Sequence, residues 1–183
     1  YVVHADVKSY FASIDHEVAL QRIRRVVVDD DVLWLWRRIM RGYGFDGVGL
    51  PVGALTSQLV ANIVLDQVDH AIKDDAGEPY YLRYMDDMVA ICRDKVHARQ
   101  VLERMADACA ALKLRLNPKS RYEPYQRGLD FCGYRIWPTH ILPRKRNVRR
   151  WRARLRRLRA DYATGRASLR DARQMIMSCI AYY

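Results

Sequence analysis

The sequence predicts an α+β fold in which short antiparallel strands pack against amphipathic helices. Two β-prone runs separated by a short turn, as in residues 80–92, are typical of a hairpin. Apolar residues at steps of three and four, as in residues 94–112, predict a helix with one buried face. Half of the 183 residues are hydrophobic, so the chain can bury a sizeable core.

The elements of the first half are predicted from cap and turn residues. An apolar run ending in a carboxylate predicts a strand, an acid before an apolar periodic segment predicts a helix start, and clustered glycines predict a turn. In chain order, these signals predict a strand from Tyr1 to Asp6, helices that begin at Asp15 and Asp31, and a helix end near Gly42. A turn at residues 44–49 should follow, and then a long helix that carries Leu59, Ile63, Val64 and Val68.

The second half is predicted in the same way. After the hairpin at residues 80–92, Asp94 can cap a helix and residues 114–117 should return as a strand. A further hairpin is expected within residues 128–137. Two helices should end the chain, the first beginning near residue 143 and the second capped by Ser168.

Two adjacent acids, Asp86 and Asp87, stand at the turn of the first predicted hairpin. Neighbouring carboxylates repel each other, and no cation partner is obvious nearby. A divalent metal relieves that repulsion, because hard cations such as Mg²⁺ prefer carboxylate oxygens. A solvated Asp-Asp turn is the plain alternative, since Asp is common in turns.

Five segments stand in an order that carries more information than any one of them. They are the strand ending at Asp6 with an aromatic residue five positions later, the glycine-punctuated loop of residues 49–58, the tetrapeptide Tyr84-Met85-Asp86-Asp87, and the segments of residues 116–120 and 129–134. Together they resemble the palm of a reverse transcriptase over almost the whole chain. The resemblance implies a polymerase palm, an antiparallel sheet packed on helices, with partial fingers and the start of a helical thumb.

The resemblance also implies a division of the chain. Residues 1–142 would form the palm with part of the fingers, including the YMDD hairpin and the primer grip. Residues 143–183 would begin a basic helical thumb. Tyr1 is not an initiator methionine and the N-terminal fingers motifs are missing, so we expect a fragment of a longer chain.

Nucleotidyl transfer uses two Mg²⁺ ions about 3.5–4 Å apart, one activating the primer hydroxyl and one holding the triphosphate. The ligands must converge from separate segments, as Asp6 at a strand end and Asp86 at a turn could do. Asp87 would be the supporting acid, Val7 completes the expected metal site, and Mn²⁺ is an expected substitute. A capping role is the alternative for Asp6. The resemblance implies that Lys119 neutralises or protonates the leaving pyrophosphate, and a surface lysine is the alternative.

The resemblance assigns further residues to the nucleotide and the primer. Phe11 would lie under the incoming sugar and exclude a ribose 2′-hydroxyl, with a core phenylalanine as the alternative. Val52, Gly53 and Gln58 belong to the expected nucleotide-binding loop. The expected primer grip, which is equally compatible with a simple packed hairpin, consists of Phe131, Cys132, Gly133 and Tyr134.

The same loop carries subfamily information. Most reverse transcriptases have Gln where Val52 stands, and most related bacterial intron enzymes have Pro where Gln58 stands. These departures, with the segment of residues 135–140, resemble the diversity-generating retroelement enzymes of the group II intron-like lineage, which copy RNA with frequent errors at adenines. Loss of the glutamine amide removes a hydrogen bond to the nucleotide sugar, which weakens discrimination between pairs.

Positive charge is concentrated in one segment. The net charge is +11, and residues 143–160 hold ten Lys and Arg residues with no acid among them. Uninterrupted cations repel each other and a polyanion relieves this, so nucleic acid is favoured over a membrane surface or an acidic protein. The residues expected to bind nucleic acid are Arg144, Lys145, Arg146, Arg149, Arg152 and Arg156.

Other function classes are excluded by what the sequence lacks. No run approaches the roughly 20 apolar residues of a membrane span. The four cysteines form no CxxC pair, which excludes zinc spacing, and are expected to be small buried residues of a reducing compartment.

The predicted function is therefore RNA-directed DNA synthesis in the cytoplasm, by a bacterial or phage-encoded protein. The expected partners are template RNA, a DNA or RNA primer, deoxynucleoside triphosphates and a basic accessory protein of the retroelement. Two alternatives remain open. One is another bacterial reverse transcriptase of the intron, retron or defence-associated type, and the other is a catalytically silent palm that binds RNA as a scaffold.

Overall fold

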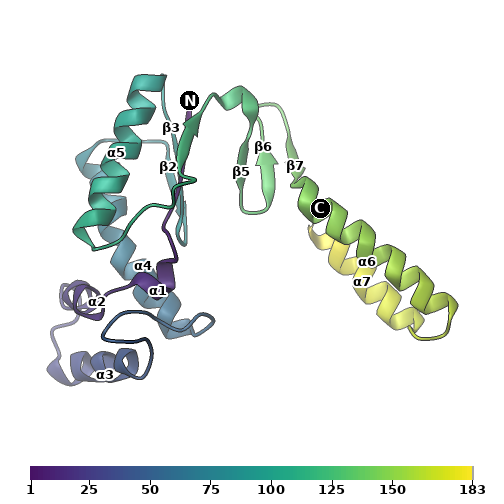
Figure 1. Ribbon diagram of the computed structural model, residues 1–183, viewed down its shortest axis with the longest axis horizontal. Helices are drawn as coiled ribbons and strands as arrows, with labels where there is room; N and C mark the ends of the chain where they lie inside the picture. Colours follow the sequence, from purple (N-terminus) through teal and green to yellow (C-terminus); the bar gives the residue numbers. More distant parts are fainter. Residues whose placement is uncertain (183) are drawn as a thin grey trace. The chain divides into compact units, whose positions relative to one another are not determined.

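The computed structural model describes residues 1–182 and divides into two compact units, Tyr1–Tyr125 and the part that begins at Gln126. Figure 1 labels their helices and strands. The elements of the first unit are β1 (Val2–Asp6), α1 (Tyr10–Ser13), α2 (His16–Ile23), α3 (Asp30–Arg41), α4 (Leu55–His70), the π-helix η1 (Ala71–Asp75), β2 (Tyr81–Tyr84), β3 (Asp87–Ile91), α5 (Lys95–Ala111) and β4 (Arg121–Glu123).

The first unit contains a four-stranded antiparallel sheet in the order β2-β3-β1-β4. Side chains alternate between its two faces, as the pleat of a strand requires. Val3 and Ala5 of β1 are fully buried and lie opposite Ala90 and Met88 of β3. The alternate positions of β1, which include Asp6, therefore point to the other face.

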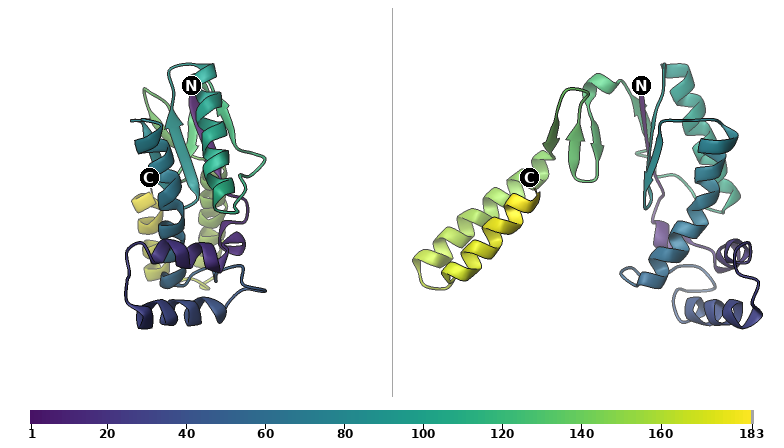
Figure 2. Two further views of the ribbon diagram at one scale, coloured as in Figure 1. Left: turned by 90° about the vertical axis from the view of Figure 1, so that its left-hand side faces the viewer. Right: turned by 180° about the vertical axis from the view of Figure 1, so that it is seen from behind.

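Helix α5 packs against the strands of this sheet, and α4 packs against α5. Figures 1 and 2 show both helices on the same side of the sheet. The core between them is apolar, with Leu65 and Val68 of α4 and Val101 and Met105 of α5 completely buried. This mixture of helices and antiparallel sheet is compatible with the predicted palm.

Two of the predicted helix caps in this unit are confirmed and one is wrong. The Asp15 side chain accepts from the amides of the first turn of α2, and Asp94 caps α5. Helix α3 is capped by Asp29 instead of Asp31, whose own amide donates to the Asp29 side chain. Three consecutive acids can each serve as a cap, and the backbone turns into the helix at the first of them.

The strand predicted at residues 114–117 is wrong. Only Leu116 forms a bridge there, opposite Val7, and the segment continues as a loop. The strand that completes the sheet is β4, which pairs with β1 a few residues later. A single long-range bridge needs no periodic pattern, so the sequence carries little trace of it.

The second unit consists of a small sheet and two helices. Its elements are the 3-10 turn η2 (Tyr125–Arg127) at the junction, β5 (Leu129–Phe131), β6 (Tyr134–Ile136), β7 (Ile141–Pro143), α6 (Lys145–Ala163) and α7 (Leu169–Tyr182). The predicted hairpin is confirmed as β5–β6, but the third strand, β7, was not expected. Ser168 caps α7 as predicted, because its Oγ accepts from the Asp171 amide at 3.2 Å. The predicted boundary at residue 142 between palm and thumb stays a prediction.

Cysteine burial follows the expectation at three positions out of four. Cys92, Cys109 and Cys179 are buried, but Cys132 is exposed. Cys132 occupies the tight β5–β6 turn, where it has a positive φ of 46°. Within residues 1–182, no helix has the length and apolar character needed to cross a membrane.

Candidate active site

The two acids of the strands lie directly opposite each other. Asp6 ends β1, Asp87 begins β3, and the two residues are partners in the antiparallel register. Asp86 is the second residue of the two-residue turn between β2 and β3. The predicted hairpin with acids at its turn is therefore confirmed, and Asp6 reaches the same end of the sheet from a distant segment.

The turn itself has an unusual backbone. Met85, its first residue, has a positive φ of 56°, a left-handed conformation that residues other than glycine adopt at a cost. Such conformations persist where surrounding contacts hold them, and they cluster at functional sites. The peptide bond that follows Met85 leads directly into Asp86.

A loop wraps around Asp6. The Asn117 side chain donates from Nδ2 to Asp6 Oδ2 at 3.1 Å, and the Asn117 amide donates to the Asp6 carbonyl at 2.7 Å. The Asp6 amide donates to Ser120 Oγ at 3.2 Å. Lys119 lies exposed between these two contacts, with its amide donating to Asn117 Oδ1 at 3.1 Å. The segment of residues 116–120 therefore lies against Asp6. Its position in the sequence did not predict this contact.

The pKa of Asp6 is raised. Burial of the carboxyl is the main cause and the neighbouring Asp86 carboxyl the next, while the hydrogen bond from Asn117 lowers the pKa. A carboxyl whose ionisation is opposed by burial and by a neighbouring carboxyl suits a divalent cation, which favours the charged form. The pair of Asp6 and Asp86 therefore fits a Mg²⁺ ligand set.

Asp87 has a different neighbour. Its Oδ1 lies 3.1 Å from His4 Nε2, and both side chains are partly exposed. Within residues 1–182, no group of three or more His, Cys, Asp or Glu side chains is arranged to hold a metal ion. The expected ligand roles of Asp6, Asp86, Asp87 and the buried Val7 stay predictions.

The residues predicted to meet the nucleotide differ in exposure. Phe11 lies on α1, partly buried against the core, with its ring centroid 5.7 Å from that of Tyr10. Val52 is 84% exposed, and Gly53 and Gln58 are also exposed. Gly53 has a φ of 97°, which favours glycine at that position. The loop is therefore accessible to a ligand, whereas Phe11 can serve both the core and a ligand.

The predicted primer grip forms the β5–β6 hairpin of the second unit. Cys132 and Gly133 form its two-residue turn. Both have a positive φ, as a type I′ hairpin turn requires. The Gly133 carbonyl accepts from the Arg144 amide at 3.0 Å. Phe131 is buried, so a packed hairpin and a primer-positioning hairpin remain compatible.

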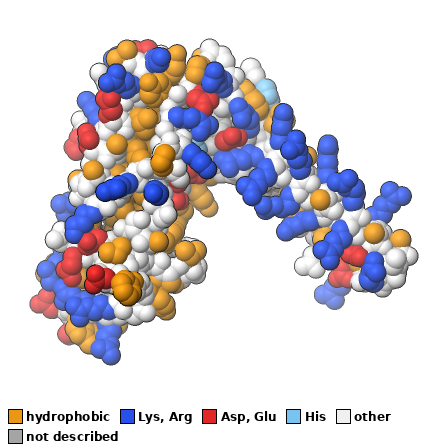
Figure 3. All heavy atoms as spheres, viewed as in Figure 1, with side chains coloured by type: hydrophobic (Ala, Val, Ile, Leu, Met, Phe, Trp, Pro, Cys, Tyr) orange, Lys and Arg blue, Asp and Glu red, His pale blue; other side chains and the backbone are white. Residues whose placement is uncertain are grey.

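The predicted nucleic-acid surface lies at the start of α6 and along it. Figure 3 shows Lys and Arg side chains crowded on this helix. Arg144 forms an ion pair within the unit, because its Nε lies 3.7 Å from Asp130 Oδ1. The other five predicted residues are exposed and form no ion pair within the described part of the chain, namely Lys145, Arg146, Arg149, Arg152 and Arg156.

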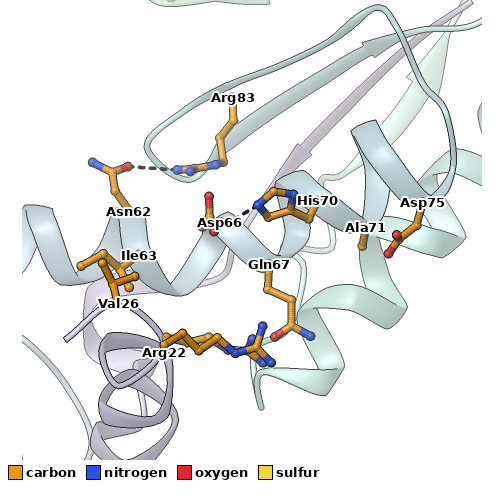
Figure 4. Close-up of a pocket in the computed structure, with 11 residues that line it drawn as sticks. Arg22, Val26, Asn62, Ile63, Asp66, Gln67, His70, Ala71, Asp75 and Arg83 are labelled. Carbon is orange, nitrogen blue, oxygen red and sulfur yellow. Dashed lines mark hydrogen bonds and ion pairs between the residues drawn. The ribbon is translucent and has the colours of Figure 1, made fainter. Parts of the chain in front are cut away.

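A cavity of about 650 Å³ lies elsewhere in the first unit (Figure 4). It is lined mainly by α4 and η1, with Arg22 of α2 and Arg83 of β2 at its sides. None of the site residues predicted from the sequence is among the described residues that line it. The acids of the β2–β3 turn and the end of β1 therefore lie apart from this cavity.

A helix-backed antiparallel sheet with acids at one end is compatible with a polymerase palm. The family model described as "Reverse transcriptase (RNA-dependent DNA polymerase)" matches residues 1–136. Because this match covers most of the chain, the protein belongs to the reverse transcriptase family.

A more distant similarity exists to Protein YkfC of Escherichia coli (strain K12). The two are 25% identical over 180 residues, which cover 74% of this chain and 46% of YkfC. The chain therefore spans about half the length of this curated relative.

Proposed function

We propose that the protein is an RNA-directed DNA polymerase that extends a DNA or RNA primer on an RNA template with deoxynucleoside triphosphates. The observation that carries the proposal is the convergence of Asp6 and Asp86 from two distant segments, with the pKa of Asp6 raised by burial and by Asp86. Membership of the reverse transcriptase family supports the same conclusion. The chain would form the palm, part of the fingers and the beginning of a thumb.

In this proposal Asp6 and Asp86 hold Mg²⁺, with Asp87 and the main chain at Val7 in supporting positions. The bound ions would activate the primer hydroxyl and neutralise the triphosphate. Asn117 would keep Asp6 ionised and oriented, because its amide stabilises the charged carboxylate. Lys119, exposed beside Asp6, would neutralise or protonate the leaving pyrophosphate. His4 would hold Asp87 through its imidazole.

The remaining assignments concern the substrate. Phe11 would exclude ribonucleotides, the exposed loop at Val52 and Gly53 would contact the nucleotide, and the β5–β6 hairpin would position the primer end. We also propose that the enzyme belongs to a diversity-generating retroelement and is error-prone. The support is Val52 in place of Gln and Gln58 in place of Pro, together with residues 135–140. A basic accessory protein would be an expected partner.

The principal competing function is a catalytically silent palm that binds RNA as a scaffold. The exposed arginines of α6 would serve such a scaffold as well as an enzyme. The acid pair does not, because two carboxyls in a partly buried position raise the cost of folding and repel nucleic acid. The acid pair therefore favours the enzyme.

The decisive experiment replaces Asp86 by Asn in the full-length protein and measures Mg²⁺-dependent extension of a DNA primer on RNA. Extension should be abolished, while affinity for the template, which depends on many phosphate contacts, should stay nearly unchanged. Asp107→Asn, an exposed acid on α5, is the matched control and should extend like the parent. Residual activity within about tenfold of the parent, a barrier change of only ~1.4 kcal/mol, would remove Asp86 from catalysis. A parent that binds RNA but makes no DNA would favour the scaffold.

A further inference from the structure

Arg83 of β2 connects the acid-bearing turn to helix α4. Its Nη1 donates to the Met85 carbonyl at 2.9 Å and to Asn62 Oδ1 at 3.0 Å. Its Nε and Nη2 donate to the two carboxylate oxygens of Asp69 at 2.8 and 2.6 Å. Figure 4 shows the guanidinium reaching the Asn62 side chain above α4. One side chain thus contacts the turn and two separate residues of α4.

The far end of this connection is rigid. The Arg83 side chain is only 11% exposed, and Asp69 accepts a further hydrogen bond from the Tyr81 hydroxyl at 2.7 Å. Helix α4 carries the completely buried Leu65 and Val68, which fix it in the core. A charge-assisted pair with two parallel N–H···O bonds is among the strongest and most directional contacts between side chains. Arg83 therefore transmits the position of α4 to the turn.

The near end of the connection is the strained part of the turn. The Met85 carbonyl belongs to the peptide bond whose nitrogen is that of Asp86, so a hydrogen bond to this oxygen sets the plane of that peptide. Met85 has a φ of 56°, and this conformation requires support from surrounding contacts. The Arg83 contact is one such support. Without it, the peptide could rotate and carry the Asp86 side chain with it.

We propose that Arg83 is a positioning residue that fixes the Met85–Asp86 peptide and thereby aims the Asp86 carboxylate at Asp6. The inference rests on the proposed metal-binding role of these two acids. The geometry requires an arginine, because only a planar guanidinium can donate to Asp69, Asn62 and the Met85 carbonyl at once. A lysine ammonium could keep the pair with Asp69 but would not hold both the turn and α4 in the same way.

The test compares Arg83→Gln and Arg83→Lys with the parent in the full-length protein. The first readout is Mn²⁺ binding measured by electron paramagnetic resonance, with Asp86→Asn as the reference for ions bound elsewhere. The second is the turnover of primer extension at saturating nucleotide and primer–template. Arg83→Gln should weaken Mn²⁺ binding about tenfold and lower kcat at least about tenfold, ~1.4 kcal/mol in the barrier. Affinity for primer–template should change by less than about twofold, and Arg83→Lys should fall between Gln and the parent.

A purely structural role is distinguished by the control Val101→Ala. Val101 is completely buried in α5 and belongs to no part of the site, so its truncation lowers the melting temperature without touching the turn. At a temperature where circular dichroism shows every variant folded, Val101→Ala should keep the Mn²⁺ affinity and kcat of the parent. Equal losses in Val101→Ala and Arg83→Gln would overturn the inference. If Arg83→Gln does not fold, Arg83→Lys, which retains the charge beside Asp69, decides in its place.

The outcomes separate this inference from the proposed function. A folded Arg83→Gln with the Mn²⁺ affinity and kcat of the parent would overturn the positioning role while the polymerase stands. A parent that makes no DNA would overturn the proposed polymerase activity, and the Mn²⁺ affinities would still decide whether Arg83 positions Asp86. A parent that polymerises but binds no Mn²⁺ at Asp86 would refute the metal role of Asp86. The ratio of kcat between Arg83→Gln and the parent would then decide whether Arg83 positions Asp86.

Discussion

Three arginines of α6 allow a quantitative test of nucleic-acid binding. Arg149, Arg152 and Arg156 are spaced by three and four residues, so they share one face of the helix. All three are exposed, and none forms an ion pair within residues 1–182. At 1.5 Å per residue they span about 10 Å, a length over which a nucleic-acid strand presents several phosphates. Replacing all three by Gln should weaken binding to RNA or to an RNA–DNA duplex regardless of sequence.

The magnitude follows from counterion release. Each phosphate contact on a duplex contributes about 0.9 to the slope of log affinity against log salt, so three contacts contribute up to ~2.7. Over a fourfold rise in salt, from about 50 to about 200 mM, a slope difference of ~2.7 corresponds to a roughly 40-fold difference in affinity loss. The parent should therefore lose roughly 40-fold more affinity than the triple variant across this range.

The assay is fluorescence anisotropy of a labelled duplex titrated at several salt concentrations. The matched control is Arg99→Gln, Arg157→Gln and Arg166→Gln combined, which removes the same charge from arginines already paired with Glu103 or Asp161. The control should change the slope much less than the test variant. Equal slopes for parent and test variant would refute phosphate binding by this face and assign it to an acidic protein or a membrane surface.

Three other expectations concern the site. Phe11→Ala should admit ribonucleotides while deoxynucleotide use persists in primer-extension assays, whereas a purely core residue would lose both together with about 3–5 kcal/mol of stability. Val52→Gln should lower misincorporation at template adenines about two- to tenfold in deep-sequenced cDNA, because a neutral hydrogen bond contributes about 0.5–1.5 kcal/mol; an accurate parent would contradict the retroelement assignment. Asn117→Ala removes the contact that lowers the pKa of Asp6, so that pKa should rise further. The acidic limb of the activity–pH profile should therefore move to higher pH. A limb that does not move would show that Asn117 does not control the ionisation of Asp6.

The sequence predicted best those parts of the fold that depend on interactions between neighbouring residues, such as helix caps. Asp15 and Asp94 each stand alone before an apolar periodic segment, so their capping roles could be predicted and are confirmed. Asp31 could not be distinguished from Asp29, because both precede the same apolar pattern. The three-residue strands β4 and β7 were missed, whereas the equally short β5 and β6 were expected from the resemblance to a primer grip. Strand β4 pairs with the distant β1, and β7 follows β6 without a recognised hairpin turn, so neither had a signal beyond its few residues.

The same distinction applies to the site. The acids were predicted because adjacent carboxylates at a hairpin turn are chemically conspicuous. The residues that contact the acids or their turn were missed, namely His4, Asn117 and Arg83. Their contacts depend on strand register and on the path of a loop. A signal for His4 was present in the sequence: it stands two residues before Asp6 in the same strand, so it must share the face of Asp6. Arg83, two residues before Met85, has no comparable signal, because its partners Asn62 and Asp69 lie on a helix 21 and 14 residues away in the sequence.

Features that oppose folding are gathered at one end of the four-stranded sheet. Burial and the neighbouring Asp86 raise the pKa of Asp6, and Met85 holds a left-handed backbone between the strands. Each of these costs is offset by a dedicated contact: Asn117, from a distant loop, for Asp6, and Arg83, which is anchored on α4 through Asp69, for Met85. A chain shaped by stability alone would place glycine or asparagine at the turn and a neutral residue at the strand end. Instead, the strain and the like charges stand at the same few residues, each held by a dedicated partner, which is the arrangement expected of a preorganised site that binds a cation.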